Sequence, residues 1–364
     1  MWRLQLPKSL QPRKSLQLPR SLQILKSLRG RSRTPSGGEF NALLREALFA
    51  ILAEDPDTAE RALTDAVRVD SGDIDAYLAL CRFYRGRGEI GRAIRLHQNL
   101  LLRKDLDARE RSRVLSELGQ DFNAGGFLRR AVASFEEVLA HDSRHKLALG
   151  ALVDLLADLQ EFPRAISLER RLAKLERRDR SREASLLYRM GDYEREEGRA
   201  SAARKAAKTA LRRDPGCARA LILLGQLEAD RGHDKAALAA WKKVPALDRS
   251  VAKDLYDKVE AAFAATNRAR DFEGFLRDLV RDNPGDTEAT LALARYLRSR
   301  GDSDLASIEL KRLLGREPGN LAARIVLGRC LLAAGREAEV VGEFASLLDL
   351  LEEAPRRADY EGLE

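Results

Sequence analysis

The sequence repeats one pattern of residues about every 34 positions, and this period limits the fold more than any other feature. Tyr77, Leu80, Tyr84, Gly88 and Ala93 follow one another at spacings of three, four, four and five residues. The spacing recurs at five later places, residues 115–138, 187–210, 221–244, 293–318 and 327–347. A period of this length is typical of chains that stack one small structural unit many times.

The spacing has a direct physical meaning. Large apolar residues three and four positions apart share one face of a helix. Gly88 stands where a first helix should end, because glycine adopts a left-handed backbone without strain. Ala93 has a small side chain where a second helix should cross the first. A proline or an Asp-Ser pair near position 32 of each repeat unit should end that second helix. The pattern predicts all-α helical hairpins of the tetratricopeptide-repeat type, stacked into a right-handed superhelical solenoid.

We expect about nine such hairpins in residues 39–352, followed by a flexible C-terminal tail at 353–364. Four extra residues lengthen each of the linkers 103–111 and 173–183. The first and seventh units fit the pattern least, and the seventh has Phe272 at the position of the small crossing residue. The predicted units begin near residues 40, 74, 112, 146, 184, 218, 253, 287 and 321.

The excess of positive charge lies at one end of the chain. Residues 1–38 contain nine of the 65 Lys and Arg residues and no acidic residue, which leaves 56 basic against 57 acidic residues in the remainder. A neutral repeat region argues against nucleic acid as a partner. Residues 8–31 also repeat a hexapeptide of the type KSLQPR. We expect residues 1–38 to form a basic, low-complexity, disordered tail.

Three further interpretations of residues 1–38 remain open. The segment could be sequence translated upstream of the true start. It could tether the protein weakly to an anionic membrane, since each basic residue near such a surface contributes about 1 kcal/mol. It could also be an organellar transit peptide.

Elsewhere the sequence argues against membrane crossing and disulfides. The longest stretch without a charged residue is Ala220–Leu227, whereas a membrane-spanning helix needs about 20 mostly apolar residues. Cys81, Cys217 and Cys330 are odd in number and far apart. A disulfide framework is therefore not expected, and a reducing compartment is the simpler interpretation.

The sequence contains no motif for a phosphate-binding loop, a zinc protease or a serine hydrolase. We therefore expect no enzymatic activity, no cofactor and no catalytic residue. His141 and His145 stand four residues apart in a predicted linker without a third ligand nearby, so we expect no metal site either. His97, by its position in the pattern, should pack in the core. Cys81 and Cys330 should be buried thiols on first helices.

Repeat arrays of this type bind other proteins through their first helices, which line a concave surface. Positions two, five, nine and twelve of each unit are expected to be exposed there, Ser116 among them. Arginine dominates these positions, and its forked donors suit carboxylates and backbone carbonyls. The alternative for each residue is an ordinary solvated surface. The predicted partner-binding residues are Arg82, Arg85, Arg113, Gln120, Asn123, Tyr188, Arg195, Arg219, Gln226, Arg295, Arg298 and Arg329.

Two blocks of sequence carry a more specific resemblance. RGRGEIGRAIRLHQNLL at 85–101 and LGQDFNAGGFLRRAVASFEEVL at 118–139 resemble the lipopolysaccharide assembly protein B family of Gram-negative bacteria. The resemblance covers residues 40–350 and includes the nine units and the two long linkers. It implies a non-enzymatic protein–protein interaction adaptor. Such an adaptor links a membrane AAA+ protease to the deacetylase that commits precursor to lipid A, and so restrains lipopolysaccharide synthesis.

The two ends of the sequence differ from that family. Its members begin with a membrane-spanning helix and end with a rubredoxin-like zinc module that carries two CxxC pairs. This sequence begins with the basic hexapeptides and has no cysteine after Cys330, so we expect neither the helix nor the module here. The alternative is a gene model that has lost both ends. We expect a cytoplasmic protein, or one held peripherally at the cytoplasmic face of the inner membrane through weak contacts of residues 1–38. The alternative function is a generic tetratricopeptide-repeat scaffold for another multi-protein complex.

Overall fold

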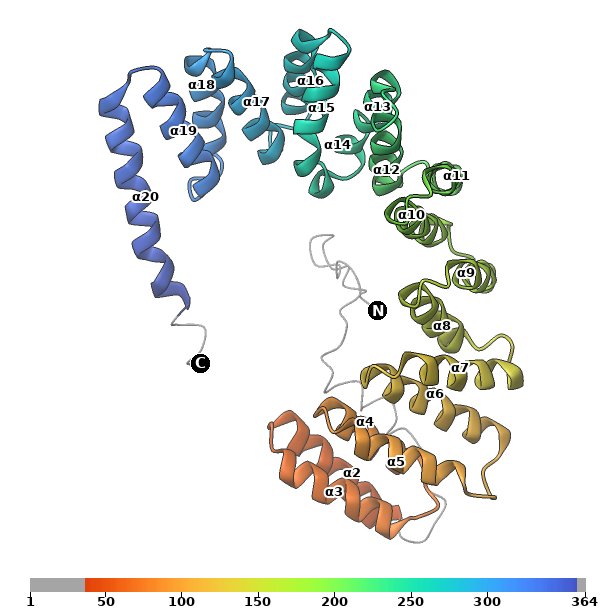
Figure 1. Cartoon of the computed structure of the whole chain (residues 1–364). Helices are drawn as coiled ribbons and strands as arrows, with labels where there is room; N and C mark the ends of the chain where they lie inside the picture. The colour runs from red at the N-terminus through yellow and green to blue at the C-terminus, as the bar shows by residue number, and fades with distance from the viewer. Residues whose placement is uncertain (1–36, 359–364) are drawn as a thin grey trace, which may run out of the picture. The chain divides into compact units, whose positions relative to one another are not determined.

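The computed structural model describes residues 37–358, and this range consists of helices and their connections, without a strand (Figure 1). The described chain divides into two compact units, with the boundary between Arg178 and Asp179. We call them the N-terminal unit and the C-terminal unit. None of the helices in residues 37–358 is long and apolar enough to cross a membrane.

The N-terminal unit contains four helical hairpins. Its helices are α2 (Gly37–Leu52), α3 (Pro56–Val69), α4 (Ile74–Gly86), α5 (Ile90–Leu101), α6 (Ala108–Ala124), α7 (Leu128–His141), α8 (Lys146–Asp158) and α9 (Phe162–Glu176). Each first helix packs against the second helix of its own hairpin and against the second helix of the hairpin before it. The first helices α4 and α6 also contact each other.

The C-terminal unit contains five hairpins, and its third hairpin is irregular. Its helices are α10 (Ser181–Glu196), α11 (Ala200–Arg213), α12 (Ala218–Ala229), α13 (Asp234–Trp241), α14 (Val244–Leu247), the 3₁₀ turns η3 (Arg249–Val251) and η4 (Lys253–Leu255), α15 (Tyr256–Ala265), α16 (Ala269–Asp282), α17 (Thr287–Ser299), α18 (Ser303–Leu314), α19 (Leu321–Ala333) and α20 (Glu337–Ala358). First helices again contact each other, α10 with α12 and α17 with α19.

A residue with a left-handed backbone closes each of the nine hairpins within residues 37–358. Glycine holds this place in six hairpins, for example Gly88 (φ 80°) and Gly126 (φ 75°), because it lacks the Cβ that strains this conformation. Glu54, Gln160 and Asn267 hold it in the other three. Five positions after each of these residues lies a buried residue of the second helix: Ala59, Ala93, Ala131, Ala165, Ala203, Ala237, Phe272, Ala306 and Val340.

Side-chain caps fix where several first helices begin. The carboxylates of Asp73, Asp107 and Asp286 accept hydrogen bonds from backbone N–H groups in the first turns of α4, α6 and α17. Asn320 does the same for α19. Each cap satisfies an N–H group that has no partner inside its own helix. These caps therefore fix the first residue of the hairpins that begin with α4, α6, α17 and α19.

The irregular hairpin of α15 and α16 has an aromatic core in place of close helix crossing. Phe272 is buried and lies 5.9 Å from Phe263, measured between ring centroids. Tyr296 meets the same ring edge-on at 5.1 Å. The preceding helix α13 ends early at Trp241, and a separate short helix follows from Val244 with Pro245 in its first turn. The bulky residue at the crossing position is thus accommodated by a locally rebuilt connection.

Two element boundaries differ from those predicted. Helix α6 begins at Ala108, inside the expected linker 103–111, because Asp107 and Glu110 form a reciprocal capping box that adds a turn. Helix α20 continues to Ala358, so residues 353–358 are helical and are not the tail that we predicted. The expected basic tail lies outside the described residues except for its last two positions, and residues 359–364 also lie outside them.

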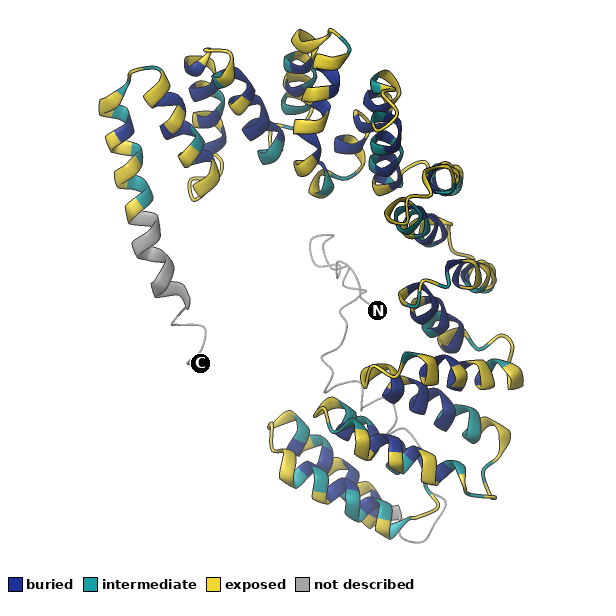
Figure 2. Ribbon diagram, in the orientation of Figure 1, coloured by how far each residue is buried: buried dark blue, intermediate teal, exposed yellow. Residues whose placement is uncertain are grey.

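Buried residues concentrate on the sides of the helices that face neighbouring helices (Figure 2). In the C-terminal unit Trp241 anchors this core. Its indole nitrogen donates to the carbonyl oxygen of Ile222 at 3.1 Å. A Cβ atom on Gly225 would lie only 2.1 Å from the same nitrogen. Glycine at this position therefore lets α12 pack directly on the indole.

Candidate partner-binding surfaces

The predicted binding residues Arg82 and Arg85 are occupied inside the N-terminal unit. Arg82 donates to Glu117 Oε1 at 2.5 Å, and Arg85 donates to Glu117 Oε2 at 2.8 Å. Arg85 also donates to Asp121 Oδ1 at 2.6 Å. Glu117 and Asp121 belong to α6, so these pairs join the first helices of two successive hairpins. The prediction that these arginines are exposed is wrong, since their side chains are only 22% and 17% exposed.

His97 completes the same network from the second helix α5. Its Nδ1 lies 2.6 Å from Asp121 Oδ2, and both side chains are fully buried. The expectation that His97 packs in the core is confirmed. The carboxylate of Asp121 therefore accepts hydrogen bonds from side chains of two helices, α4 and α5. The set Arg82, Arg85, His97, Glu117 and Asp121 is called the Arg–Glu–Asp network below.

Electrostatics in this network favour the charged forms of Glu117 and Arg85. Burial alone would raise the pKa of Glu117, but the hydrogen bond and charge of Arg82 and the charge of Arg85 outweigh it and lower that pKa to about 2. Burial would lower the pKa of Arg85, whereas Glu117 and Asp121 raise it. The network thus holds Glu117 and Arg85 charged although both are largely removed from water.

Other predicted residues of the N-terminal unit have mixed surroundings. Arg113 is partly exposed and forms an ion pair with Asp75 of the preceding first helix. Ser116 is buried, so the expectation of its exposure is wrong. Gln120 and Asn123 are exposed on α6. Only these last two present free polar groups to solvent in the way that partner binding requires.

The C-terminal unit presents more of the predicted side chains to solvent. Arg219, Arg295 and Arg329 are exposed on α12, α17 and α19, and no ion pair to them is found within the described residues. Arg195 is exposed but pairs with Asp192 at 3.0 Å. Helices α17 and α19 contact each other. Arg295 and Arg329 occupy equivalent positions 34 residues apart on these two helices, so they extend one surface.

Three predicted residues of this unit are half-buried. Gln226 donates to Asp230 Oδ1 at 2.8 Å. Burial raises the pKa of Tyr188, and the charge of Asp192 adds to this shift. Arg298 has a buried Nε without a hydrogen-bond partner within the described chain. The exposed arginines Arg219, Arg295 and Arg329 are therefore the strongest candidates for contact with a partner.

Chemistry-bearing residues outside these surfaces have structural surroundings. Cys81 and Cys330 are buried, as predicted, and burial raises the pKa of both thiols. His145 accepts a hydrogen bond from the backbone of Ala148 and caps α8. Within residues 37–358 no group of three His, Cys, Asp or Glu side chains could hold a metal ion. Neither thiol is activated as a nucleophile would be.

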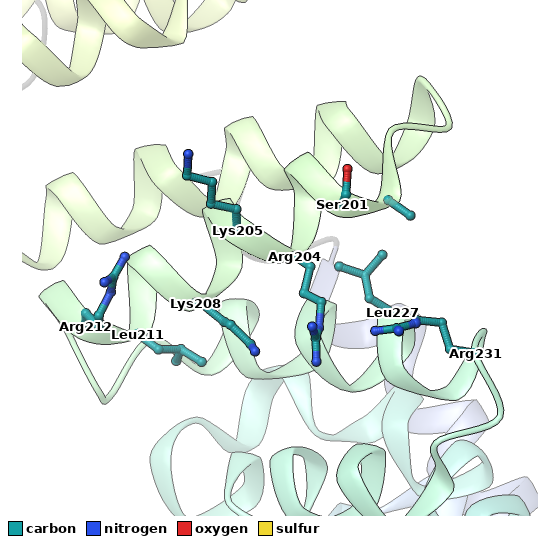
Figure 3. A pocket seen from close by; sticks show the side chains of 9 residues that line it. Ser201, Arg204, Lys205, Lys208, Leu211, Arg212, Leu227 and Arg231 are labelled. Carbon is teal, nitrogen blue, oxygen red and sulfur yellow. The ribbon is translucent and has the colours of Figure 1, made fainter.

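Sequence reasoning missed a groove in the C-terminal unit, lined mainly by one face of α11. The groove has a volume of 890 Å³, and α12 and its following turn form its other side. Figure 3 shows Arg204 and Lys208 extending from α11 into this space and Arg231 entering it from the opposite side. The signal was present in the sequence, because residues 200–213 contain five basic residues and no acid.

Two comparisons of sequence place these features in a family. The tetratricopeptide-repeat family model matches residues 116–181, 188–250 and 291–355. The chain is 26% identical to lipopolysaccharide assembly protein B of Escherichia coli strain K12 over 284 residues, which span 77% of this chain and 73% of that protein. It is 25% identical to the protein of the same name from Haemophilus influenzae over 247 residues, 68% of this chain and 62% of the relative.

Solved structures also resemble the chain. A MamA protein is 24% identical with a TM-score of 0.35, and the match covers 49% of this chain and 95% of MamA. The pilF protein of Pseudomonas aeruginosa is 17% identical with a TM-score of 0.38, over 59% of this chain and 94% of that one. The segments matched by the family model include hairpins of both units. The chain therefore belongs to the tetratricopeptide-repeat family and is similar to lipopolysaccharide assembly protein B.

Proposed function

We propose that this chain is a non-enzymatic adaptor that restrains lipopolysaccharide synthesis. It brings the deacetylase that commits precursor to lipid A to a membrane AAA+ protease, at the cytoplasmic face of the inner membrane. The observation that carries the proposal is the similarity to lipopolysaccharide assembly protein B over 284 residues, which runs through 77% of the chain. The repeat fold supports it, because stacked hairpins offer extended surfaces for binding other proteins.

The exposed arginines of the first helices are the proposed contact residues. Arg219, Arg295 and Arg329 have no ion pair within the described chain, so a partner carboxylate does not have to displace an internal one. Each guanidinium can bind a carboxylate through two parallel hydrogen bonds. Gln120 and Asn123 supply uncharged donors and acceptors in the N-terminal unit. Arg82 and Arg85 support the fold in this scheme and do not contact the partner.

Affinity capture from crosslinked native cells tests the proposal. The full chain carries a tag, and the variant Arg219→Glu/Arg295→Glu/Arg329→Glu is captured beside it. We expect mass spectrometry to recover the protease and the deacetylase with the wild-type chain and to lose at least one of them with the variant. Surface substitutions at residues without internal partners usually change stability by less than about 0.5 kcal/mol, so the variant should stay folded.

A second measurement separates adaptor from scaffold. Deleting the gene should lengthen the half-life of the deacetylase and raise the lipopolysaccharide content, and restoring the wild-type chain should reverse both. An unchanged half-life would contradict the proposal. Recovery of an unrelated stable assembly would then favour the generic scaffold. Capture that survives the triple substitution would move the binding surface away from these arginines.

A further inference from the structure

The groove beside α11 stands out by its charge. Five cationic side chains line it, and no acidic residue belongs to its lining. Glu228 lies beneath them and is largely buried. It accepts from Arg204 at 2.5 Å and lies 3.9 Å from Arg231. Lys205 and Lys208 are exposed and form no ion pair within the described residues. The cationic lining residues are Arg204, Lys205, Lys208, Arg212 and Arg231.

A comparable groove of the same unit shows that this excess is not a general property of the repeat. That groove has a volume of 390 Å³ and is lined by residues of α16, α17 and α18. Its Arg277 pairs with Glu273 at 2.9 Å, and its Arg281 pairs with Asp278 at 2.8 Å. Its Arg312 pairs with Glu309 at 3.0 Å. Three of its four arginines are therefore neutralised locally.

The N-terminal unit offers a third example of the same kind. A groove of 310 Å³ is lined there by residues of α7, α8 and α9. Its Arg164 forms ion pairs with both Glu136 and Glu161. Its Arg171 donates to the backbone carbonyl of Ser143 at 2.6 Å. The α11 groove differs from both in that no acidic residue lines it, whereas Glu309 and Glu136 line the other two.

The floor of the α11 groove is apolar. Leu211 of α11 is partly exposed, and Leu227 of α12 closes the groove from below. Figure 3 shows both leucine side chains between the basic ones. Lining residues run from Ala200 to Arg212, a rise of about 18 Å along a helix. An extended segment of about five or six residues would span that length.

We propose that this groove binds a short acidic segment of a partner protein, one in which leucine or another apolar residue alternates with Asp or Glu. Its carboxylates bind Lys205, Lys208 and Arg212, and its apolar side chains rest on Leu211. Buried Glu228 keeps Arg204 and Arg231 in place at the base. Its cations lie mostly on the second helix α11, and Arg219, Arg295 and Arg329 are not among them, so this proposal does not depend on the proposed function.

The shape of the site favours a peptide over other anionic partners. A membrane is too broad to enter a groove, and its headgroups would gather at protruding basic residues instead. A nucleic acid would need positive charge along several neighbouring hairpins, whereas the comparable groove on α16–α18 is mostly neutralised. A peptide chain can follow the groove and satisfy both its cations and its apolar floor.

Selection from a library of random peptides tests the proposal directly. Dodecapeptides displayed on phage are selected on the full-length protein at about physiological salt. We expect enriched sequences that contain at least three acidic residues interspersed with apolar ones. The best of them is synthesised with a fluorescent label and titrated by anisotropy. A second peptide with Gln in place of each Glu and Asn in place of each Asp provides the chemical control.

Matched variants locate the binding. Lys205→Glu/Lys208→Glu/Arg212→Glu should weaken binding of the acidic peptide by about tenfold or more, since three charge contacts turn repulsive. Lys243→Glu/Lys258→Glu/Arg270→Glu makes the same charge change at three exposed residues of this unit outside the groove, and it should retain the affinity within about twofold. Circular dichroism of both variants checks that they are folded.

Several results would overturn the proposal. One is a selection that enriches no acidic sequence. Another is equal binding of the acidic peptide and its amide counterpart, or equal losses in the two triple variants. A third result comes from sedimentation with vesicles of phosphatidylglycerol and phosphatidylcholine. If the vesicles sediment the wild-type chain but not the groove variant, and no peptide is enriched, the groove is a lipid site. If the groove variant loses peptide binding but still captures the protease and the deacetylase, the two surfaces are independent.

Discussion

The hairpins of α4–α6 and the helix α11 are both rich in cations, yet the structure uses those cations in opposite ways. In the N-terminal unit, Arg82 and Arg85 are largely buried and bound to Glu117 and Asp121. In the C-terminal unit, Lys205 and Lys208 are exposed and have no acidic partner within the described residues. Position in a repeat therefore does not decide whether a basic residue is paired inside the protein. Arg82 and Arg85 are paired because α6, the next first helix, supplies Glu117 and Asp121.

The contrast follows from the cost of burying charge. A guanidinium that leaves water must be compensated by hydrogen bonds and opposite charge, and once compensated it has little left to offer a ligand. An exposed cation loses little on folding and keeps its ability to attract an anion. We therefore expect substitutions in the Arg–Glu–Asp network to affect stability, and substitutions along α11 to affect binding.

The largest expected effect is on stability, from Asp121→Asn. This change leaves Arg85 and His97 buried without the carboxylate that both contact, and removing one partner of a buried pair costs about 3–5 kcal/mol. Urea unfolding measures the loss, and hydrogen exchange should show faster opening of α5 and α6. Asp192→Asn is the control, because Asp192 pairs with Arg195 at the surface and should matter by less than about 1 kcal/mol. Similar losses in both variants would contradict the contrast between buried and exposed pairs.

A second prediction uses the pKa of Glu117, which is lowered to about 2. Because the pKa is lower in the folded protein, the stabilisation is present above the unfolded value of about 4.3 and is lost as the pH falls from there toward 2. Glu117→Gln lacks this contribution, which is about 3 kcal/mol at neutral pH because each unit of pKa shift corresponds to about 1.4 kcal/mol. The gap between wild type and variant in urea unfolding should therefore narrow from pH 6 to pH 3. A gap that stays constant would show that charge is not its cause.

A third prediction adds a packing test from the C-terminal unit, at the contact between α12 and α13. Gly225→Ala places a Cβ atom 2.1 Å from the indole nitrogen of Trp241, so the indole must move and its hydrogen bond to Ile222 is lost. Overpacking of this kind costs about 1–3 kcal/mol. Gly150→Ala is the matched control, since its Cβ would meet only Leu172, at an ordinary 3.7 Å, and it should stabilise α8 by about 0.5–1 kcal/mol. Thermal unfolding that moves in the same direction for both variants would refute this account.

Much of the fold was predictable because its pattern is local. Glycine or another residue with a left-handed backbone ends each first helix, and a buried residue follows five positions later, as the spacing of Gly88 and Ala93 predicted. Gln160 and Asn267 occupy the equivalent turns of their hairpins although they are not glycine. Those two hairpins were therefore predictable from the repeat period and not from a turn glycine. The extended start of α6 depends on the capping box of Asp107 and Glu110, a local signal that the repeat register concealed.

The candidate surfaces were less predictable because they depend on pairs of residues that lie far apart in the sequence. Arg85 and Glu117 are separated by 32 residues, and only the stacking of successive hairpins brings them together. A register argument treats Arg85 and Arg295 alike, although one is bound to two buried acids and the other is exposed. The α11 groove, in contrast, had a local signal in its acid-free sequence, but on a second helix, where no binding residue was predicted.

The smallest expected change in stability belongs to the groove itself. Lys205→Glu/Lys208→Glu/Arg212→Glu removes no ion pair within the described residues, so the free energy of unfolding should change by less than about 0.5 kcal/mol per site. The substitution removes the favourable interaction of Arg212 with the C-terminal end of α11, which is destabilising. It also relieves repulsion among neighbouring cations, which is stabilising, so the two effects partly cancel. Urea unfolding of this variant beside Arg85→Gln measures the contrast directly. If the groove variant unfolded as readily as Arg85→Gln, the α11 cations would be structural like those of α4, and the separation of stabilising from binding charges would fail.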